Sequence, residues 1–232
     1  TSPAGHGIVS KDDLKITGGI LKVEAASHGL KANDSVRFTG AELTVTAGKD
    51  GIHCENKDDT SLGFVYVSGG AMNIQAEGDG ISAGGSLHIT GGSFDILAGG
   101  GSENGTKESS GGWGGFPGGG RPGMPGPGQS SATDDDSTSM KGIKAASDVQ
   151  IDAGTFTINS ADDAIHSNGS VTVNGGTFAI ATGDDGIHGD ENLTVSGGTI
   201  QITESYEGLE ALHITIAGGD VDLVATDDGV NA

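Results

Sequence analysis

Four features are scarce in this sequence, and each scarcity narrows what the chain can be. A single cysteine, Cys54, rules out an intrachain disulfide framework. Aromatic residues make up only 4% of the 232 residues, so they would fill a conventional globular core poorly. Eleven Lys and Arg stand against 32 Asp and Glu, a formal net charge of −21 that argues against nucleic acid as a direct partner. No apolar run approaches the roughly 20 residues of a membrane span, so we expect no membrane insertion.

Glycine, by contrast, is abundant, and it marks an internal repeat. A short phrase, which in its full form is carboxylate, Gly and an aliphatic residue, recurs nine times, and its fullest copy is Asp184-Asp185-Gly186-Ile187-His188. Six copies keep the carboxylate, and the other three have His6, His28 or Lys141 in its place. The glycine of each copy, which is alanine once, serves as an anchor; the anchors stand at positions 7, 29, 51, 80, 142, 164, 186, 208 and 229. Six of the eight separations are 21 or 22 residues. A period of this length predicts a solenoid.

Apolar residues alternate within each repeat. Pairs such as Val171 and Val173, or Phe178 and Ile180, are spaced by two and separated by a Gly-Gly corner, a pattern typical of strands. Each repeat therefore predicts three short strands and three corners. We expect an all-β fold, a right-handed three-faced parallel β-helix of about nine turns of 22 residues. A leucine-rich repeat would need a Leu-x-x-Leu-x-Leu pattern and a helix, which this sequence lacks.

Two anchor separations are longer than 22 residues. The first places about seven extra residues near 57–63, and the second about 40 at roughly 99–139. The second insertion is rich in Gly, Pro and Ser, so we expect a long loop that interrupts a single β-helix domain spanning 1–232. Trp113 in this loop is a candidate carbohydrate contact, because aromatic faces stack on sugar rings.

The carboxylates before the anchors are the first candidate site. Stacked turns would bring them about 5 Å apart, where like charges repel unless they are protonated or bridged. Ca²⁺, which takes six to eight flexible oxygen ligands, suits two stacked turns. The predicted metal ligands are Asp162, Asp163, Asp184, Asp185, Glu207, Asp227 and Asp228. Asp190, at the opposite edge of the strand that follows Gly186, is a candidate ligand of a second cation site, with a turn-stabilising role as the alternative. The alternative is that Asp before Gly accepts backbone N–H groups at the corner.

Two residues beyond the anchor, a column of polar residues should point outward, because it is offset by one from the buried aliphatic column. His53, His166, His188 and Lys144 fall in this column. We predict that His166, His188 and Lys144 contact carbohydrate, and the alternative is that the column has no ligand. Cys54, one position further, falls in a column of small residues and is expected to be a buried packing residue.

The repeated Asp-Asp-Gly-Ile-His phrase, the Gly-Gly-Thr corners followed by Phe or Ile, and the Gly-rich insertion resemble a family of bacterial cell-surface β-helix domains. Members bind cellulose and acidic polysaccharides such as polygalacturonate, and their fold is similar to that of pectate lyases. The resemblance implies a calcium-bearing carbohydrate-binding module that is extracellular or on the bacterial cell surface. It extends to the residues of the phrase itself: Asp162, Asp163, His166, Asp184, Asp185 and His188.

Three functions follow from these features. The first is a non-catalytic module in which Ca²⁺ bridges an anionic polysaccharide and the acidic protein. The second is a Ca²⁺-dependent pectate lyase, which needs a basic residue near the calcium; Lys144 is the nearby candidate, and the scarcity of bases argues against this function. The third is a structural, filament-forming protein, because uncapped β-helix ends expose strand edges that could associate end to end.

Overall fold

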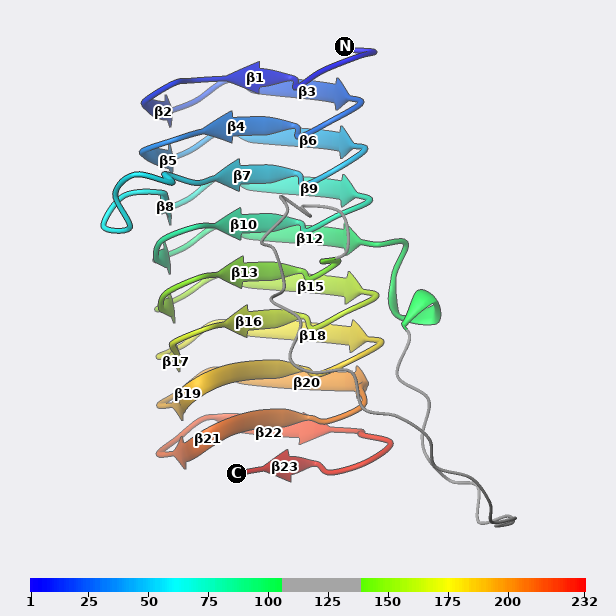
Figure 1. The fold of residues 1–232 in the computed structure, drawn as a ribbon. Helices are drawn as coiled ribbons and strands as arrows, with labels where there is room; N and C mark the ends of the chain where they lie inside the picture. The colour runs from blue at the N-terminus through cyan, green and yellow to red at the C-terminus, as the bar shows by residue number, and fades with distance from the viewer. Residues whose placement is uncertain (106–138) are drawn as a thin grey trace, which may run out of the picture.

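The computed structural model describes residues 1–105 and 139–232 as a right-handed parallel β-helix. Strands of successive turns lie directly beneath one another, with the N-terminus at one end of the stack and the C-terminus at the other (Figure 1). The predicted all-β fold, with about nine turns spaced by about 22 residues, is confirmed. Within the described ranges, no helix has the length and apolarity that a membrane crossing requires.

Each turn contributes one strand to each of three faces. The first face follows the anchors and contains β1 (Ile8–Val9), β4 (Leu30–Ala32), β7 (Ile52–Cys54), β10 (Ile81–Ala83), β13 (Ile143–Ala145), β16 (Ile165–Ser167), β23 (Val230–Asn231) and the first parts of β19 (Ile187–Val195) and β21 (Leu209–Ile216). The second face contains β2 (Asp13–Ile16), β5 (Ser35–Phe38), β8 (Phe64–Val67), β11 (Leu87–Ile89), β14 (Val149–Ile151), β17 (Ser170–Val173) and the remainders of β19 and β21. The third face contains β3 (Ile20–Ala25), β6 (Glu42–Ala47), β9 (Ala71–Ala76), β12 (Ser93–Ala98), β15 (Thr155–Ser160), β18 (Thr177–Thr182), β20 (Thr199–Glu204) and β22 (Asp220–Leu223).

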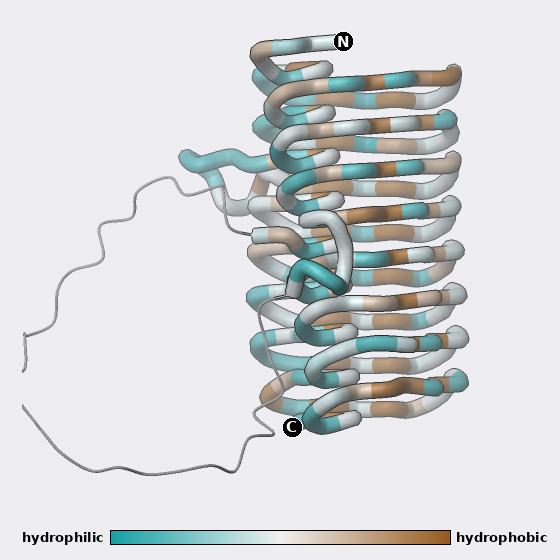
Figure 2. The backbone as a smooth tube through the Cα atoms, turned by 90° about the vertical axis from the view of Figure 1, so that its right-hand side faces the viewer, coloured by the Kyte–Doolittle hydropathy of each residue, from teal (hydrophilic) through white to brown (hydrophobic). Residues whose placement is uncertain are grey.

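The core is a set of stacked apolar columns. Strand pairing is parallel and in register, so that Ile143 lies opposite Ile165, which lies opposite Ile187. Figure 2 shows apolar and polar residues alternating along the strands, as one buried and one exposed side require. Phe94, Phe156 and Phe178 stack with ring centroids 4.7 and 4.6 Å apart and planes within 5°. Cys54 is buried, as predicted, and burial raises the pKa of its thiol to about 12.

Glycine at the anchor lets successive turns approach closely. A Cβ atom on Gly142 would lie 2.5 Å from both the carbonyl oxygen of Ala164 and Cγ2 of Ile158. At the corners, the second glycine of each pair carries the positive φ, as in Gly176 at 110°. The repeated glycines therefore determine how close the turns can lie, and with that the spacing of the side chains on the first face.

Both insertions lie at corners. Residues 55–63 separate β7 from β8, and residues 99–142 separate β12 from β13. Directly after β12, a short 3₁₀ helix η1 (Ser102–Asn104) packs near the edge of the third face, where the backbone N–H of Ser102 donates to Oδ1 of Asn159. Residues 106–138, and with them the predicted carbohydrate contact Trp113, lie outside the described residues.

Candidate functional site

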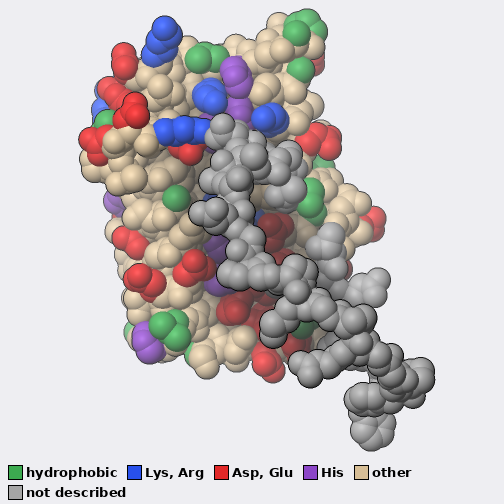
Figure 3. All heavy atoms as spheres, viewed as in Figure 1, with side chains coloured by type: hydrophobic (Ala, Val, Ile, Leu, Met, Phe, Trp, Pro, Cys, Tyr) green, Lys and Arg blue, Asp and Glu red, His purple; other side chains and the backbone are tan. Residues whose placement is uncertain are grey.

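Basic and acidic residues are distributed unevenly along the helix. Every Lys and Arg stands at or before position 144, whereas residues 145–232 contain 15 Asp and Glu and no Lys or Arg. In Figure 3, Lys and Arg gather over the N-terminal turns. The C-terminal turns therefore form the region where a bound cation would relieve the most repulsion.

The repeat phrase builds an Asp–His pair on each complete copy. The aspartate just before the anchor and the histidine three residues later lie on the same side of the corner. Oδ2 of Asp50 is 2.8 Å from Nδ1 of His53, and the same atoms are 2.9 Å apart in Asp163 and His166. In Asp185 and His188 they are 3.4 Å apart. The motif is thus a repeated carboxylate–imidazole contact that follows the first face.

The second oxygen of each carboxylate binds the backbone. Oδ1 of Asp50 accepts the N–H of Asp79. Oδ1 of Asp163 accepts the N–H of Asp185, and Oδ1 of Asp185 accepts the N–H of Glu207. The corner-capping alternative therefore holds for one oxygen of each carboxylate, while the other oxygen is directed to a histidine.

These contacts correct the expected orientation of the histidine column. We predicted that His53 points outward, but it is only 5% exposed. His166 and His188 are partly buried as well. The physical reason is that the buried carboxylate draws each ring back against the corner instead of letting it extend into solvent. The expected outward orientation was wrong for His53, and His166 and His188 are only partly exposed.

Lys141 is a cation that the sequence reasoning did not recognise as part of the site. It occupies the position before the anchor, where six other turns carry a carboxylate. Its Nζ lies 2.6 Å from Oδ2 of Asp163 and 2.9 Å from Oδ1 of Asp162. Burial alone would raise the pKa of Asp163, but His166 and Lys141 outweigh it and hold that pKa well below its usual range. The signal in the sequence was a lone lysine within a column of acids.

Within residues 1–105 and 139–232, four groups of side chains bring potential metal-ligand atoms within 4.8 Å of one another. They are Asp162 with Asp163 and Asp184; Asp163 with His166 and His188; Asp185 with His188 and Glu210; and His28 with Asp50 and His53. The predicted ligands Asp162, Asp163, Asp184 and Asp185 therefore do belong to such groups.

The other predicted metal ligands lie apart from these groups. Oδ1 of Asp190 is 3.4 Å from Nε2 of His188, at the edge of the cluster. The carboxylate of Glu207 accepts two hydrogen bonds from Nδ2 of Asn231. Among the described residues, neither Asp227 nor Asp228 joins a group of this kind, and both are exposed.

Lys144, a predicted carbohydrate contact, is held by a buried carboxylate. Its Nζ lies 3.6 Å from Oδ2 of Asp79 and donates to the hydroxyl of Ser139 at 3.2 Å. Burial and the neighbouring Asp50 raise the pKa of Asp79, while Lys144 opposes that rise. Lys144 therefore has a structural partner already, which reduces its freedom to contact a ligand.

At the C-terminal end of the face, Glu210 has an unusual ionisation. Burial, together with the neighbouring Asp185, raises the pKa of Glu210 to about 7. The hydrogen bond with Asp185 is the main reason that the pKa of His188 is raised as well. Nδ1 of His188 lies 3.3 Å from Oε2 of Glu210. Protons therefore compete with cations for this group near neutral pH.

Replacing Glu210 with Gln should raise the melting temperature above pH 7 and leave it nearly unchanged below pH 4.5. The folded carboxyl has a pKa of about 7 against 4.5 when unfolded, so between these values the folded state holds a proton that the unfolded state has released. Wild-type stability thus falls as pH rises through this window, and Gln removes the penalty. Thermal unfolding with a chelator present measures it. The control is Glu191→Gln, an exposed residue nearby, and equal effects of both variants would contradict the expectation.

Together, the solenoid fold and the contacts of the first face define a parallel β-helix repeat protein that places carboxylate and imidazole groups in a row along one face. A protein-family model described as "Carbohydrate-binding domain-containing protein" matches residues 1–186, and the chain belongs to that family. The comparison with curated proteins found no match, and neither did the comparison with solved structures. The family supports carbohydrate binding, as the sequence resemblance implied.

Proposed function

We propose that this protein is a non-catalytic carbohydrate-binding module for an acidic or plant-type polysaccharide, such as polygalacturonate or cellulose, and that it uses Ca²⁺. The observation that carries the proposal is the carbohydrate-binding family match over residues 1–186. In this proposal the module works outside the cell or at the bacterial cell surface, where such polymers occur. End-to-end self-association through the terminal turns stays a separate prediction.

The proposed calcium site is the group of Asp162, Asp163 and Asp184. All three donors are carboxylate oxygens, which Ca²⁺ prefers, and they come from two neighbouring turns. Lys141 already contacts two of them, so Ca²⁺ and the ammonium group compete for the same charge. Binding of Ca²⁺ would displace Lys141 from Asp162 and replace a single positive charge with two.

Calcium would also solve the problem of like charges between protein and ligand. The turns after residue 144 contain no Lys or Arg, so on their own they repel a polyuronate. A Ca²⁺ ion held by three carboxylates keeps free coordination positions, and a uronate carboxylate can take them. His166 and His188, which are partly buried beside this group, would contact sugar hydroxyls at its edge.

A lyase reaction has weaker support from the same geometry. Abstraction of a proton beside a uronate carboxylate needs a free base close to the calcium. Lys144 lies in the same column as His166, but its ammonium group is beside the buried Asp79. Because the ammonium group of Lys144 is paired with Asp79 and is not free beside the calcium site, we propose binding without catalysis.

The experiment is calorimetric titration of Ca²⁺, followed by polygalacturonate, into the wild type and into the Asp184→Asn/Asp185→Asn variant. Asn at position 185 keeps the oxygen that accepts the N–H of Glu207, and both substitutions remove the charge while keeping the size of the side chain. We expect calcium affinity to fall about tenfold or more. Polygalacturonate binding should fall with it, and a chelator should have the same effect on the wild type.

The matched control is Asp220→Asn/Asp222→Asn, which removes two exposed charges from β22 on the third face. This variant should bind Ca²⁺ as the wild type does. Calcium binding that is unchanged in Asp184→Asn/Asp185→Asn would show that the site is elsewhere. Absorbance of unsaturated uronate after incubation with polygalacturonate and Ca²⁺ would overturn the non-catalytic assignment.

A further inference from the structure

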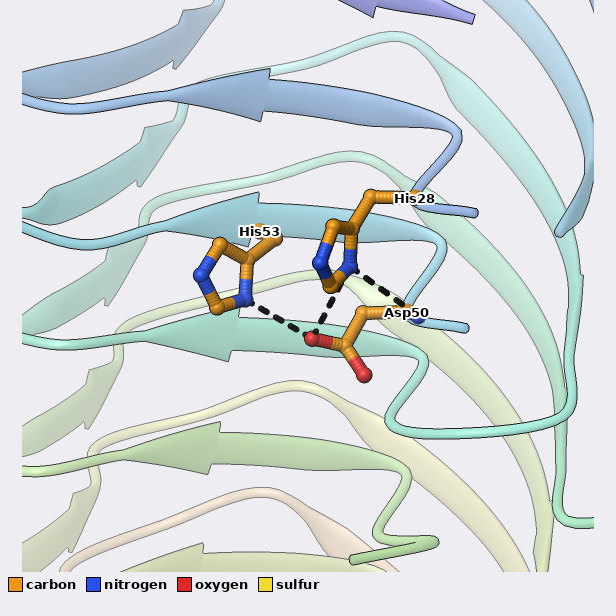
Figure 4. Close-up of side chains that lie close together, drawn as sticks. All are labelled: His28, Asp50 and His53. Atoms are coloured by element: carbon orange, nitrogen blue, oxygen red, sulfur yellow. Dashed lines mark hydrogen bonds and ion pairs between the residues drawn. The ribbon is translucent and has the colours of Figure 1, made fainter. Parts of the chain in front are cut away.

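His28, Asp50 and His53 form a compact cluster beneath the first face, away from the acidic C-terminal turns. His28 precedes the anchor of the second turn, and Asp50 and His53 flank the anchor of the third. All three are buried, with exposed fractions of 1%, 4% and 5%. Figure 4 shows both rings directed at one carboxylate oxygen, Oδ2 of Asp50. Nδ1 of His28 is 3.3 Å from that oxygen, and Nδ1 of His53 is 2.8 Å from it.

The contacts of His28 leave two acceptor atoms facing each other. The backbone N–H of Asp50 donates to Nδ1 of His28, so this nitrogen presents a lone pair. The same nitrogen lies 3.3 Å from Oδ2 of Asp50. Two acceptor atoms in a buried site repel each other unless a positive charge lies between them.

The far side of His53 supports the same conclusion. Among the residues that the structure describes, Nε2 of His53 has no hydrogen-bond partner although it is buried. The nearest carboxylate oxygen is Oε2 of Glu55, 3.6 Å away. A metal ion on Nδ1 would place the ring proton on Nε2, where Glu55 could accept it. Metal-bound histidines commonly have this outer carboxylate partner.

The cluster also lacks the lysine that neutralises the C-terminal group. Within the described residues, the carboxylate of Asp50 is ion-paired with His28 and His53, whereas Asp163 contacts Lys141. His6 stacks on His28 with ring centroids 5.1 Å apart, which places a third imidazole beside the cluster.

We propose that His28, Asp50 and His53 bind a divalent transition-metal ion of the zinc type, which links the second and third turns. Two imidazole nitrogens and one carboxylate oxygen are donors that Zn²⁺ takes and Ca²⁺ does not favour. Zinc bonds of about 2.0–2.1 Å in a tetrahedron separate neighbouring donors by about 3.4 Å. The observed Nδ1–Oδ2 separations of 3.3 and 2.8 Å lie close to this value, and all three donor atoms lie within 4.8 Å of one another. Water would complete the coordination. This proposal is independent of the calcium site.

The test measures bound Zn²⁺ in the full chain by elemental analysis after dialysis, in a His166→Gln/His188→Gln background that removes the C-terminal histidine ligands. In this background we expect one tightly bound ion. His28→Gln, and separately Asp50→Asn, should lose it, with Zn²⁺ affinity lowered about tenfold or more. Asp50→Asn keeps the oxygen that accepts the N–H of Asp79, so the corner stays capped. Zinc should also raise the melting temperature of the background protein but not of either variant.

His88→Gln is the matched control, because His88 contacts a single carboxylate, Asp152, on the second face. It should bind zinc as the background protein does. Co²⁺ provides a spectroscopic measurement, since absorption bands of a four-coordinate ion should appear in the background and vanish with His28→Gln. A background protein that binds no Zn²⁺, or a His28→Gln variant that binds it equally well, would overturn the proposal.

Discussion

Lys141→Met is expected to destabilise the calcium-free protein by about 3–5 kcal/mol, because it leaves buried carboxylates without their cation. Asp163 is 2% exposed and lies 2.6 Å from Nζ of Lys141. The same change should raise calcium affinity, since the ammonium group no longer competes for Asp162 and Asp163. Calcium should therefore restore most of the lost stability. Chemical denaturation with a chelator and with saturating Ca²⁺ measures both effects.

Lys22→Met controls for the loss of one positive charge, because Lys22 is exposed on β3 of the third face. Its stability should change little, with or without Ca²⁺. If Lys141→Met is destabilised and Ca²⁺ does not restore its stability, the calcium site proposed beside Lys141 is contradicted. A Lys141→Met variant as stable as the wild type would instead show that Asp163 does not depend on this ion pair.

Phe156→Ala is expected to cost about 3–5 kcal/mol, the range for removing a large aromatic side chain from a packed core. Phe156 is 1% exposed and is the middle ring of the stack with Phe94 and Phe178. Phe94→Ala should cost less, because Phe94 loses one stacked neighbour and Phe156 loses two; each aromatic pair adds about 0.5–1.5 kcal/mol beyond buried area. Denaturant titration compares the two.

The control for the core prediction is Thr157→Ala, the next residue on β15, whose side chain is exposed. It should shift stability by no more than about 0.5 kcal/mol. Equal costs for Phe156→Ala and Phe94→Ala would mean that the stacked rings act only through their separate burial. A small cost for both would contradict the view that the apolar columns hold the turns together.

The fold was largely predictable because each repeat contains the same pattern of strand and corner residues. Alternation around Val171 and Val173 defines strands, and the Gly-Gly corners end them. A constant period then requires like residues to stack, so Phe156 had to meet Phe178. For the same reason, the spacing of the repeat alone places the carboxylates Asp162, Asp163 and Asp184 together.

The directions of the polar side chains were less predictable. The period placed His53 in a column offset from the core. It did not predict the contact with Asp50 that buries the ring of His53. Lys141 interrupts the acidic column in the sequence, yet its contact with both Asp162 and Asp163 depends on how a long side chain crosses from one turn to the next. The direction that each of these side chains takes depends on the local balance between ion pairing and solvation.

By itself, the sequence determined the period, the strands, the corners and the stacked columns, because these follow from spacing and from the backbone properties of glycine. Only the tertiary structure decided how side chains of different residue types contact one another across turns. His28 and Asp50 are 22 residues apart and come from copies of the phrase that differ in their residues, so no single repeat shows their contact. The stacking of the two turns brings these residues together, and burial strengthens the electrostatic interaction between them. In this repeat protein, the pattern within one repeat specifies the strands and corners, whereas each candidate site forms from side chains of neighbouring turns.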